Sequence, residues 1–330
     1  MADTHLGFDL PLRPRIKRRR RGPDFFANYR TALQPALERK VDIVVHGGDL
    51  LYRSRVPAFL VEMSLEPLVH IAEMGIPVFL VPGNHERGNI PLHLWARHPN
   101  LHVFDRPKTF THTISGKLLS FSGFPYRRNI ISVFKEELNK TGYDRVTSDI
   151  RFLCIHQAIE GARVGIMNYT FRSGPEVING ADIPHGFAAV LSGHIHRAQL
   201  LTHSLHKKRL TAPVIYPGSV ERTSFVERDE IKKYVILKVD LQGYVHVKFI
   251  PLKTRPMINL VYNVTYPDKQ YLIRELKEML SDIDPDAVVR IQIKGTSASS
   301  AEDILSAELL RRISPPTMNI SLSVIQPSNI

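Results

Sequence analysis

The stretch Val81-Pro82-Gly83-Asn84-His85-Glu86-Arg87 decides how the rest of the chain is interpreted. Pro82 fixes its own φ and Gly83 admits backbone conformations that other residues avoid, so the stretch predicts a tight turn. The apolar run 77–81 in front of it predicts a buried strand. Asn84 and His85 are therefore expected just past the carboxyl end of a strand, which is the edge where open α/β sheets bind ligands.

Four other segments place polar side chains in comparable positions. Apolar runs at 41–45, 152–155 and 187–191 predict strands that end in aspartate or histidine, and helical spacing between them is typical of βαβ units. A D-x-H triplet opens the chain, and an extended segment would point both of its side chains the same way. His46 is interpreted as a strand-end residue rather than a ligand. The predicted site residues are Asp3, His5, Asp49, Asn84, His85, His156, His194 and His196.

This mixture of donors indicates a metal centre. Carboxylates, imidazoles and an amide without thiolates suit Mn²⁺, Fe or Zn²⁺ and disfavour a cysteine-type structural zinc site. One ion would not use so many ligands. Two ions about 3.5–4 Å apart, bridged by one carboxylate, would use them, and that arrangement supports in-line displacement at phosphorus.

Composition limits the class of protein. With 330 residues, of which 43% are hydrophobic and 23% charged, the chain is ordinary for a soluble globular protein, and its length favours two domains. No apolar run has membrane-spanning length and no signal peptide is visible, so a cytoplasmic location without membrane association is expected. The single Cys154 excludes an intramolecular disulfide and fits a reducing compartment.

The charge balance predicts an anionic partner. Lys plus Arg number 44 against 32 Asp plus Glu, a formal net charge of +12. Nucleic acid is the leading partner, an anionic membrane surface the second, and general solubility the third interpretation. Seven basic residues between Arg13 and Arg21 occur without an acid, and we weigh DNA contact equally against a solvated, mobile loop. The predicted DNA-contacting residues are Arg15, Lys17, Arg18, Arg19, Arg20, Arg21, Arg53, Arg87, Arg127 and Arg197.

A change of pattern near residue 255 predicts a domain boundary. Strand-like runs continue to 245–249, and beyond 251–256 the order becomes strand, helix, strand, helix, strand within 257–325. The expected domains are 1–255, which carries the predicted site, and a smaller α/β unit at 256–330.

The order D-x-H, G-D, G-N-H-E, H-Q, G-H-x-H resembles the calcineurin-like metallophosphoesterases. The stretches 2–7, 48–50 and 216–222 resemble, more narrowly, SbcD-type nucleases of DNA double-strand-break repair. The resemblance implies an α/β sandwich of two β-sheets flanked by helices, followed by a small C-terminal α/β capping domain. It also implies two divalent ions, with Mn²⁺ preferred and Fe or Zn²⁺ open, and DNA, a homodimeric partner copy and an SbcC-type ATPase as partners.

Roles for the site residues also follow from this resemblance. Asp3, His5, Asp49 and His196 would hold the first ion, and Asp49 would bridge to the second. Asn84, His156 and His194 would complete the second ion. His85 would be a non-ligand that protonates the leaving 3′ oxygen or stabilises charge in the transition state.

The chain departs from the family pattern at both ends. Only Met1 and Ala2 precede the D-x-H triplet, where the family has a hydrophobic strand, so we expect that the protein starts upstream or that this chain is truncated. No obvious helical segment follows the capping-like unit to dock an ATPase. The leading function is a manganese-dependent DNA exonuclease and endonuclease. The alternatives are a nucleotide or cyclic-nucleotide phosphodiesterase and a catalytically impaired DNA-end-binding scaffold subunit.

Overall fold

The computed structural model describes residues 1–11, 13, 18–86, 97–240, 242–264, 268–295 and 302–325. The chain divides into two compact units. Unit 1 comprises Met1–Phe8, Gly22–Arg222 and Glu230–Lys253, and unit 2 comprises Asp9–Arg21, Thr223–Asp229 and Thr254–Ile330. Two short segments from the first 230 residues thus group with the C-terminal part. The domain limits 1–255 and 256–330 stay a prediction.

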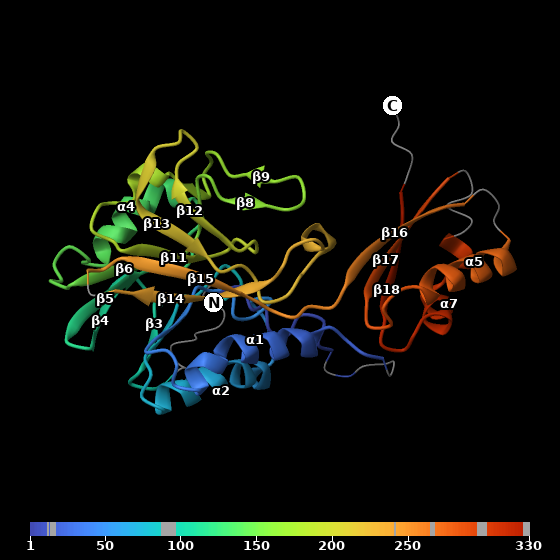
Figure 1. The fold of residues 1–330 in the computed structure, drawn as a ribbon, viewed down its shortest axis with the longest axis horizontal. Helices are drawn as coiled ribbons and strands as arrows, with labels where there is room; N and C mark the ends of the chain where they lie inside the picture. Colours follow the sequence, from blue (N-terminus) through green and yellow to red (C-terminus); the bar gives the residue numbers. More distant parts are fainter. Residues whose placement is uncertain are drawn as a thin grey trace. The chain divides into compact units, whose positions relative to one another are not determined.

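Unit 1 is built on two larger sheets and an antiparallel hairpin (Figure 1). The smaller sheet is parallel and has the order β1-β2-β3, and the six-stranded mixed sheet has the order β12-β13-β11-β6-β5-β4. The strands are β1 (Val44–His46), β2 (Val78–Leu80), β3 (Leu101–Val103), β4 (Lys108–Ile114), β5 (Lys117–Gly123), β6 (Ile150–His156), β11 (Ala189–Gly193), β12 (Gln199–His203) and β13 (Arg209–Tyr216), with the hairpin β14 (Lys233–Val239) and β15 (Val245–Pro251).

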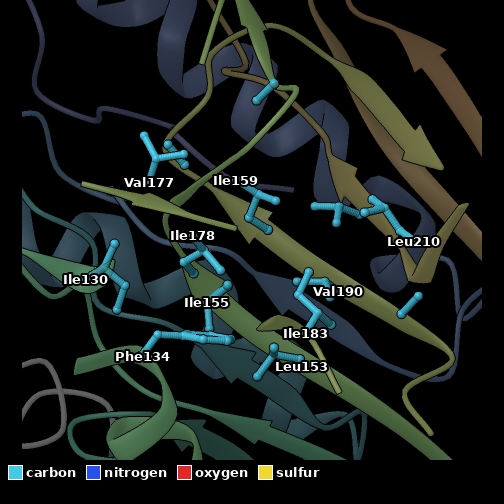
Figure 2. Close-up of a cluster of buried hydrophobic side chains, with 14 of the residues drawn as sticks. Ile130, Phe134, Leu153, Ile155, Ile159, Val177, Ile178, Ile183, Val190 and Leu210 are labelled. Atoms are coloured by element: carbon cyan, nitrogen blue, oxygen red, sulfur yellow. The ribbon is translucent and has the colours of Figure 1, made fainter. Parts of the chain in front are cut away.

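Both faces of the six-stranded sheet are buried, which is why β6 is an almost continuous apolar run. Side chains alternate along the strand, so Phe152 and Cys154 join Phe79 and Phe121 in one core cluster. Leu153 and Ile155 face the other way. They join a second cluster with Ile130 and Phe134 of helix α4 (Ile130–Lys140), as Figure 2 shows.

Two longer helices belong to the layer of the smaller sheet. Helix α1 spans Gly22–Leu37 and helix α2 spans Ala58–Glu73. Helix α2 contacts β2 and β3, and the Tyr29 hydroxyl of α1 donates to the Ser64 carbonyl of α2 at 2.9 Å. Shorter elements of unit 1 are β7 (Ala158–Ile159), β8 (Arg163–Val164), β9 (Tyr169–Thr170), β10 (Val177–Ile178) and η1 (Gly180–Asp182), whereas η2 (Phe225–Glu227) belongs to unit 2. The predicted fold of two β-sheets flanked by helices is confirmed.

Unit 2 contains the predicted strand, helix, strand, helix, strand order. Its three parallel strands lie in the order β16-β17-β18. The elements are β16 (Met257–Asn263), α5 (Lys269–Ser281), β17 (Val288–Lys294), α7 (Ala307–Ile313) and β18 (Asn319–Val324). Leu272 and Leu276 of α5 pack with Val289, Ile291 and Ile293 of β17 in its own core. Within the described ranges of both units, no helix has the length and apolar character needed to cross a membrane.

Candidate functional site

Three predicted ligands lie at the end of a strand of unit 1 or within four residues beyond it. Asn84 lies four residues after β2, His156 is the last residue of β6, and His194 follows β11. The strands β6 and β11 pair in parallel, with Gly193 opposite His156. Parallel strands end at one edge of their sheet, so the pairing of β6 with β11 brings His156 and His194 to the same edge.

Asn84, His156 and His194 converge on one point, which we call the strand-end half of the site. The Asn84 Oδ1 atom lies 3.1 Å from Nε2 of His156 and 2.9 Å from Nδ1 of His194. The Nδ1–H group of His156 donates to the Gly47 carbonyl at 2.8 Å, which leaves Nε2 to face the site. An amide oxygen and two ring nitrogens at these distances are a donor set for one divalent ion.

Asp3, His5 and His196 form a second group, which we call the segment half because two of its members come from the segment 1–6. Their ligand atoms all lie within 4.8 Å of one another. The Nε2 atoms of His5 and His196 are 2.9 Å apart. The backbone N–H of His194 donates to both carboxylate oxygens of Asp3, at 3.0 and 3.2 Å.

Asp49 links the two halves. It belongs to one possible ligand group with His5 and His85 and to another with Asp3 and His156. Its Oδ2 atom lies 3.4 Å from Nε2 of His156, and its Oδ1 atom accepts from the His85 backbone N–H at 2.9 Å. A carboxylate in this position can share its oxygens between two ions.

Four of these residues adopt the left-handed backbone conformation. The φ angles are 52° at Asp3, 43° at His5, 51° at Asp49 and 82° at His194. The expectation of an extended D-x-H triplet is therefore wrong, although Asp3 and His5 do point to the same region. Non-glycine residues with positive φ are uncommon and concentrate at functional sites, where the surrounding structure maintains them.

Two glycines allow the loops to approach one another. A Cβ atom at Gly83 would lie 2.2 Å from Oδ1 of Asp49, and one at Gly48, where φ is 104°, would lie 2.3 Å from Nδ1 of His156. Both distances are far below van der Waals contact, so any larger residue would displace a predicted ligand.

His85 lies beside Asp49 with its ring partly exposed. Its ring Nδ1–H donates to the Tyr52 carbonyl, and its Nε2 lies 3.7 Å from Oδ2 of Asp49. The side chain is 33% exposed, whereas that of His156 is fully buried. The bond to Tyr52 fixes the ring and leaves Nε2 on the side of Asp49.

The segment 1–6 is attached to the loop after β1 rather than forming a strand. The backbone N–H groups of Asp3, His5 and Leu6 donate to the carbonyls of Gly48, Asp49 and Leu50 at 2.8, 3.0 and 2.8 Å. Among the described residues only an isolated parallel bridge, Leu6 with Leu51, is present there. The D-x-H triplet thus depends on individual hydrogen bonds more than on a sheet ladder.

Buried His46 anchors this segment and is not part of either ligand group. Its Nδ1 accepts from the Gly48 N–H at 3.3 Å, so Nε2 carries the proton and donates to Thr4 Oγ1 at 3.1 Å. Thr4 Oγ1 in turn donates to the Leu50 carbonyl at 3.0 Å. Only a neutral imidazole satisfies this chain of bonds, and burial lowers the pKa of His46 to about 3.

Glu86 is a residue to which sequence reasoning assigned no role, although it belongs to the opening stretch. Its carboxylate is fully buried and accepts from the Leu51 N–H at 2.8 Å and the Gly83 N–H at 2.7 Å. It therefore joins the loop that carries Asp49 to the turn that carries Asn84. Burial, followed by the charge of Asp49, raises the pKa of Glu86 to about 8.

The charges in the site depend strongly on one another. Burial raises the pKa of Asp3, and burial lowers the pKa of His194 to about 3. Burial alone would raise the pKa of Asp49 and lower that of His156. Their mutual attraction outweighs it, so the pKa of Asp49 is lowered and that of His156 is raised to about 9. A divalent cation would compete with the proton on His156, since imidazole binds metals only when deprotonated.

The residues present fit two divalent ions. The donors are hard or borderline atoms, namely two carboxylates, an amide oxygen and imidazole nitrogens, and the single cysteine is buried in the core away from them. The ligand atoms of Asp3, His5 and His196 lie within 4.8 Å of one another, as do those of Asp3, Asp49 and His156, which is close enough for each set to bind one ion.

The predicted DNA-contacting residues are scattered. Arg15, Lys17 and Arg87 lie outside the described residues. Arg53 is exposed, with its guanidinium 4.7 Å from the Tyr52 ring, and Arg197 donates to Asn168. Arg127 pairs with Glu137 at 2.5 Å.

The described arginines of the basic run have partners within unit 2. Arg18 donates to the Met318 carbonyl and to Ser314 Oγ, both at 2.9 Å, and Arg19 pairs with Asp286 at 3.0 Å. The Arg20 side chain and the Arg21 backbone N–H both bind Asp9. A freely solvated loop does not describe these four arginines, and their contact with DNA stays a prediction.

Comparison with known proteins identifies the family of the chain and proteins that are similar to it. A family model described as calcineurin-like phosphoesterase matches residues 1–198. The chain is similar to the DNA double-strand break repair protein Mre11 of Methanopyrus kandleri, with 23% identity over 326 residues, which cover 92% of this chain and 65% of that protein. It is also similar to Mre11 of Archaeoglobus fulgidus, with 24% identity over 322 residues (90% and 68%), and of Haloferax volcanii, with 28% over 308 residues (89% and 60%). The chain thus spans about two thirds of the length of these relatives.

Proposed function

The chain belongs to the calcineurin-like phosphoesterase family, and from this membership we propose that it is a two-metal phosphodiesterase acting on DNA, an exonuclease and endonuclease of double-strand-break repair. The observation that carries the proposal is the pair of donor groups, the segment half and the strand-end half, with Asp49 between them. Such a pair of sites is suited to holding both the attacking and the leaving oxygen of a phosphodiester. DNA as the substrate is supported by the names of the relatives and by the net charge of +12.

Each half of the site would hold one ion. Asp3, His5 and His196 with Asp49 would hold the first, and Asn84, His156 and His194 with Asp49 the second. The ions, which we propose to be Mn²⁺, would supply charge stabilisation at phosphorus and a nucleophile at neutral pH. The carbonyl of Gly47 would keep His156 in the tautomer whose Nε2 is free to bind, and the carbonyl of His196, which accepts from Ser219 N–H at 3.0 Å and Lys232 Nζ at 3.2 Å, would orient that residue.

His85 would act on the leaving group. Its ring is fixed by the Tyr52 carbonyl, and its backbone N–H donates to Asp49, so one turn sets the position of its Nε2 relative to the proposed bridging carboxylate. When protonated, Nε2 can donate to the leaving 3′ oxygen, a general-acid role worth about 10²–10⁴ in rate.

Contacts with DNA and the assembly state belong to the same proposal. Exposed Arg53 is adjacent to Tyr52, whose carbonyl binds the ring of His85, and so is well suited to contact phosphates that flank the reacting one. An SbcC-type ATPase partner, a homodimer and a cytoplasmic location are further parts of the proposal.

Digestion of end-labelled linear and hairpin DNA with Mn²⁺ tests the proposal. We expect cleavage with Mn²⁺, none with excess chelator, and none from Asp49→Asn. In parallel, duplex DNA should inhibit hydrolysis of a small chromogenic phosphodiester by the same protein. If the small substrate is hydrolysed and DNA neither competes nor is cut, the protein is a small-molecule phosphodiesterase. If DNA is bound and neither substrate is hydrolysed, it is a scaffold subunit.

A further inference from the structure

Tyr126 lies in the chain between β5 and α4, beside the strand-end half of the site. Strand β5 pairs in parallel with β6, so the chain after Gly123 leaves the sheet at the edge where His156 ends β6. Tyr126 follows Gly123 by three residues. Buried Gln157 of the β6 end donates from Nε2 to the Arg127 carbonyl at 3.0 Å, which holds this part of the chain in place.

The half-buried ring of Tyr126 packs against two of the three strand-end ligands. Its centroid lies 5.6 Å from that of His194, at an interplanar angle of 40°, and 6.1 Å from that of His156, at 72°. Ring pairs at these separations attract one another beyond simple burial. The Tyr126 backbone N–H donates to the Pro82 carbonyl at 2.9 Å, on the turn that carries the third ligand, Asn84. One residue therefore supports all three ligands.

The hydroxyl group of Tyr126 is bound to a carboxylate that is itself fixed. It donates to Oε2 of Glu176 at 2.9 Å, and Oε1 of Glu176 accepts from the Asn129 N–H at 2.9 Å. The carbonyl of Pro175 accepts from the Ile131 N–H in the first turn of α4 at 3.1 Å. Because the hydroxyl is engaged in this way, Tyr126 presents its ring, rather than its oxygen, to the imidazoles.

The two imidazoles of the strand-end half differ in what fixes them. The Nδ1–H group of His156 donates to the Gly47 carbonyl, so a bond to the backbone sets its ring. The Nδ1 atom of His194 faces Asn84, and its Nε2 has no hydrogen-bond partner within the part of the chain that the structure describes. Histidine ligands usually donate their second N–H to an acceptor that orients the ring. At His194, packing against Tyr126 replaces that bond.

We propose that Tyr126 is a positioning residue for the ion of the strand-end half, whose ring orients the His194 imidazole, and that Glu176 holds Tyr126 in place. The inference rests on the proposed two-metal function and deepens it. The segment half has ring packing of its own, since the centroids of His5 and His196 are 4.8 Å apart. Loss of the Tyr126 ring therefore weakens the second ion and spares the first.

Calorimetric titration with Mn²⁺ tests this on the full chain. In Tyr126→Leu the affinity of one site should fall by about 10–100-fold while the other keeps its parent value. Tyr126→Phe retains the ring and should restore most of the lost affinity. Tyr143→Leu is the matched control, because it removes another half-buried tyrosine of unit 1, whose ring packs on Phe187 at 5.3 Å, and it should leave both affinities unchanged.

Three outcomes of the titration would overturn the proposal. Parent affinities in Tyr126→Leu would show that the ring does not position the ligands. Equal weakening in Tyr126→Leu and Tyr143→Leu would show a general loss of stability. A loss in Tyr126→Phe as large as that in Tyr126→Leu would show that the hydroxyl, and not the ring, is what matters.

Electron paramagnetic resonance adds a reading that does not depend on hydrolysis. Two Mn²⁺ ions that share a carboxylate are magnetically coupled, so the parent loaded with one ion per site should give a coupled spectrum. Tyr126→Leu at the same loading should give the spectrum of isolated Mn²⁺, and excess Mn²⁺ should restore the coupling. A coupled spectrum in Tyr126→Leu at the lower loading would overturn this inference alone. A parent that binds no Mn²⁺ would overturn the proposed two-metal function and this inference with it.

Discussion

The two halves of the predicted metal centre reach similar geometry by different means. In the strand-end half, His156 ends β6 and His194 follows β11, and these two strands pair over five residues, while Asn84 lies on the turn after β2. In the segment half, Asp3 and His5 have left-handed backbones and are held by separate hydrogen bonds to the loop after β1. Paired strands are held by a series of backbone hydrogen bonds, whereas the segment 1–6 is held by a few separate ones. We therefore expect the segment half to be the more sensitive to single substitutions around it.

Asp49 is shared by both halves, so its removal should abolish metal binding in both of them. Asp49→Ala leaves the facing imidazoles without their carboxylate, so we expect both ions to be lost and hydrolysis to fall to background. Metal content of the purified variant, measured by plasma mass spectrometry after dialysis against Mn²⁺, checks this. Asp144→Ala removes an exposed aspartate and should keep both ions. Retention of one full equivalent of metal in Asp49→Ala would show that one half binds without the bridge.

His85→Ala should leave both halves intact and still reduce turnover. The ring Nε2 lies 3.7 Å from Asp49, and the ring is held by Tyr52. In the proposed role, loss of the ring would remove a proton donor rather than a ligand. We expect kcat to fall by about 10²–10⁴ with metal content and DNA affinity unchanged. His206→Gln, at an exposed histidine, is the matched control. A drop in metal content would instead make His85 a ligand.

Glu86→Gln should weaken the strand-end half selectively. The amide can accept one backbone N–H, but its NH₂ group then faces the other donor, from Leu51 or Gly83. The turn that carries Asn84 is then no longer held firmly to the loop that carries Asp49. Metal affinity at the strand-end half should therefore fall by about 10–100-fold. Calorimetric titration with Mn²⁺ resolves the two sites, and exposed Glu62→Gln serves as the control. Equal weakening of both sites would mean that the halves are not independent.

The strand-end half was largely predictable from the sequence, because apolar runs that end in polar residues indicate where parallel strands stop. The element order of unit 2 was predictable for the same reason. The left-handed φ at Asp3 and His5 was not, since non-glycine residues adopt it only when tertiary contacts demand it. The role of Glu86 was hidden as well. It depends on a bond to Leu51, 35 positions away, that no local pattern signals.

The basic run shows another limit of local reasoning. A cluster of arginines predicts a polyanion partner or a solvated loop, but Arg18 binds Met318 and Arg19 binds Asp286. Residues so far apart in the chain give no local signal of their contact in a single sequence. Composition therefore predicted the charge of the surface and not which arginines are available to DNA.

The His46 network that supports the segment half should respond to acid. Burial lowers the pKa of His46 to about 3, whereas an unfolded chain takes up this proton near pH 6.5. Below pH 6.5 the unfolded state binds more protons than the folded state, so the free energy of unfolding falls as the pH decreases toward 3. The contribution is about 1.4 kcal/mol per pH unit for one proton. The free energy of unfolding is measured by urea denaturation between pH 4 and 6 with chelator present. Its dependence on pH should be shallower by about this amount in His46→Gln than in the parent protein. The exposed His206→Gln variant should keep the parent slope. If both variants keep the parent's dependence on pH, His46 does not take up a proton on unfolding in this range. The hydrogen bonds between His46 and Thr4 would then not make the stability of the segment half depend on acid.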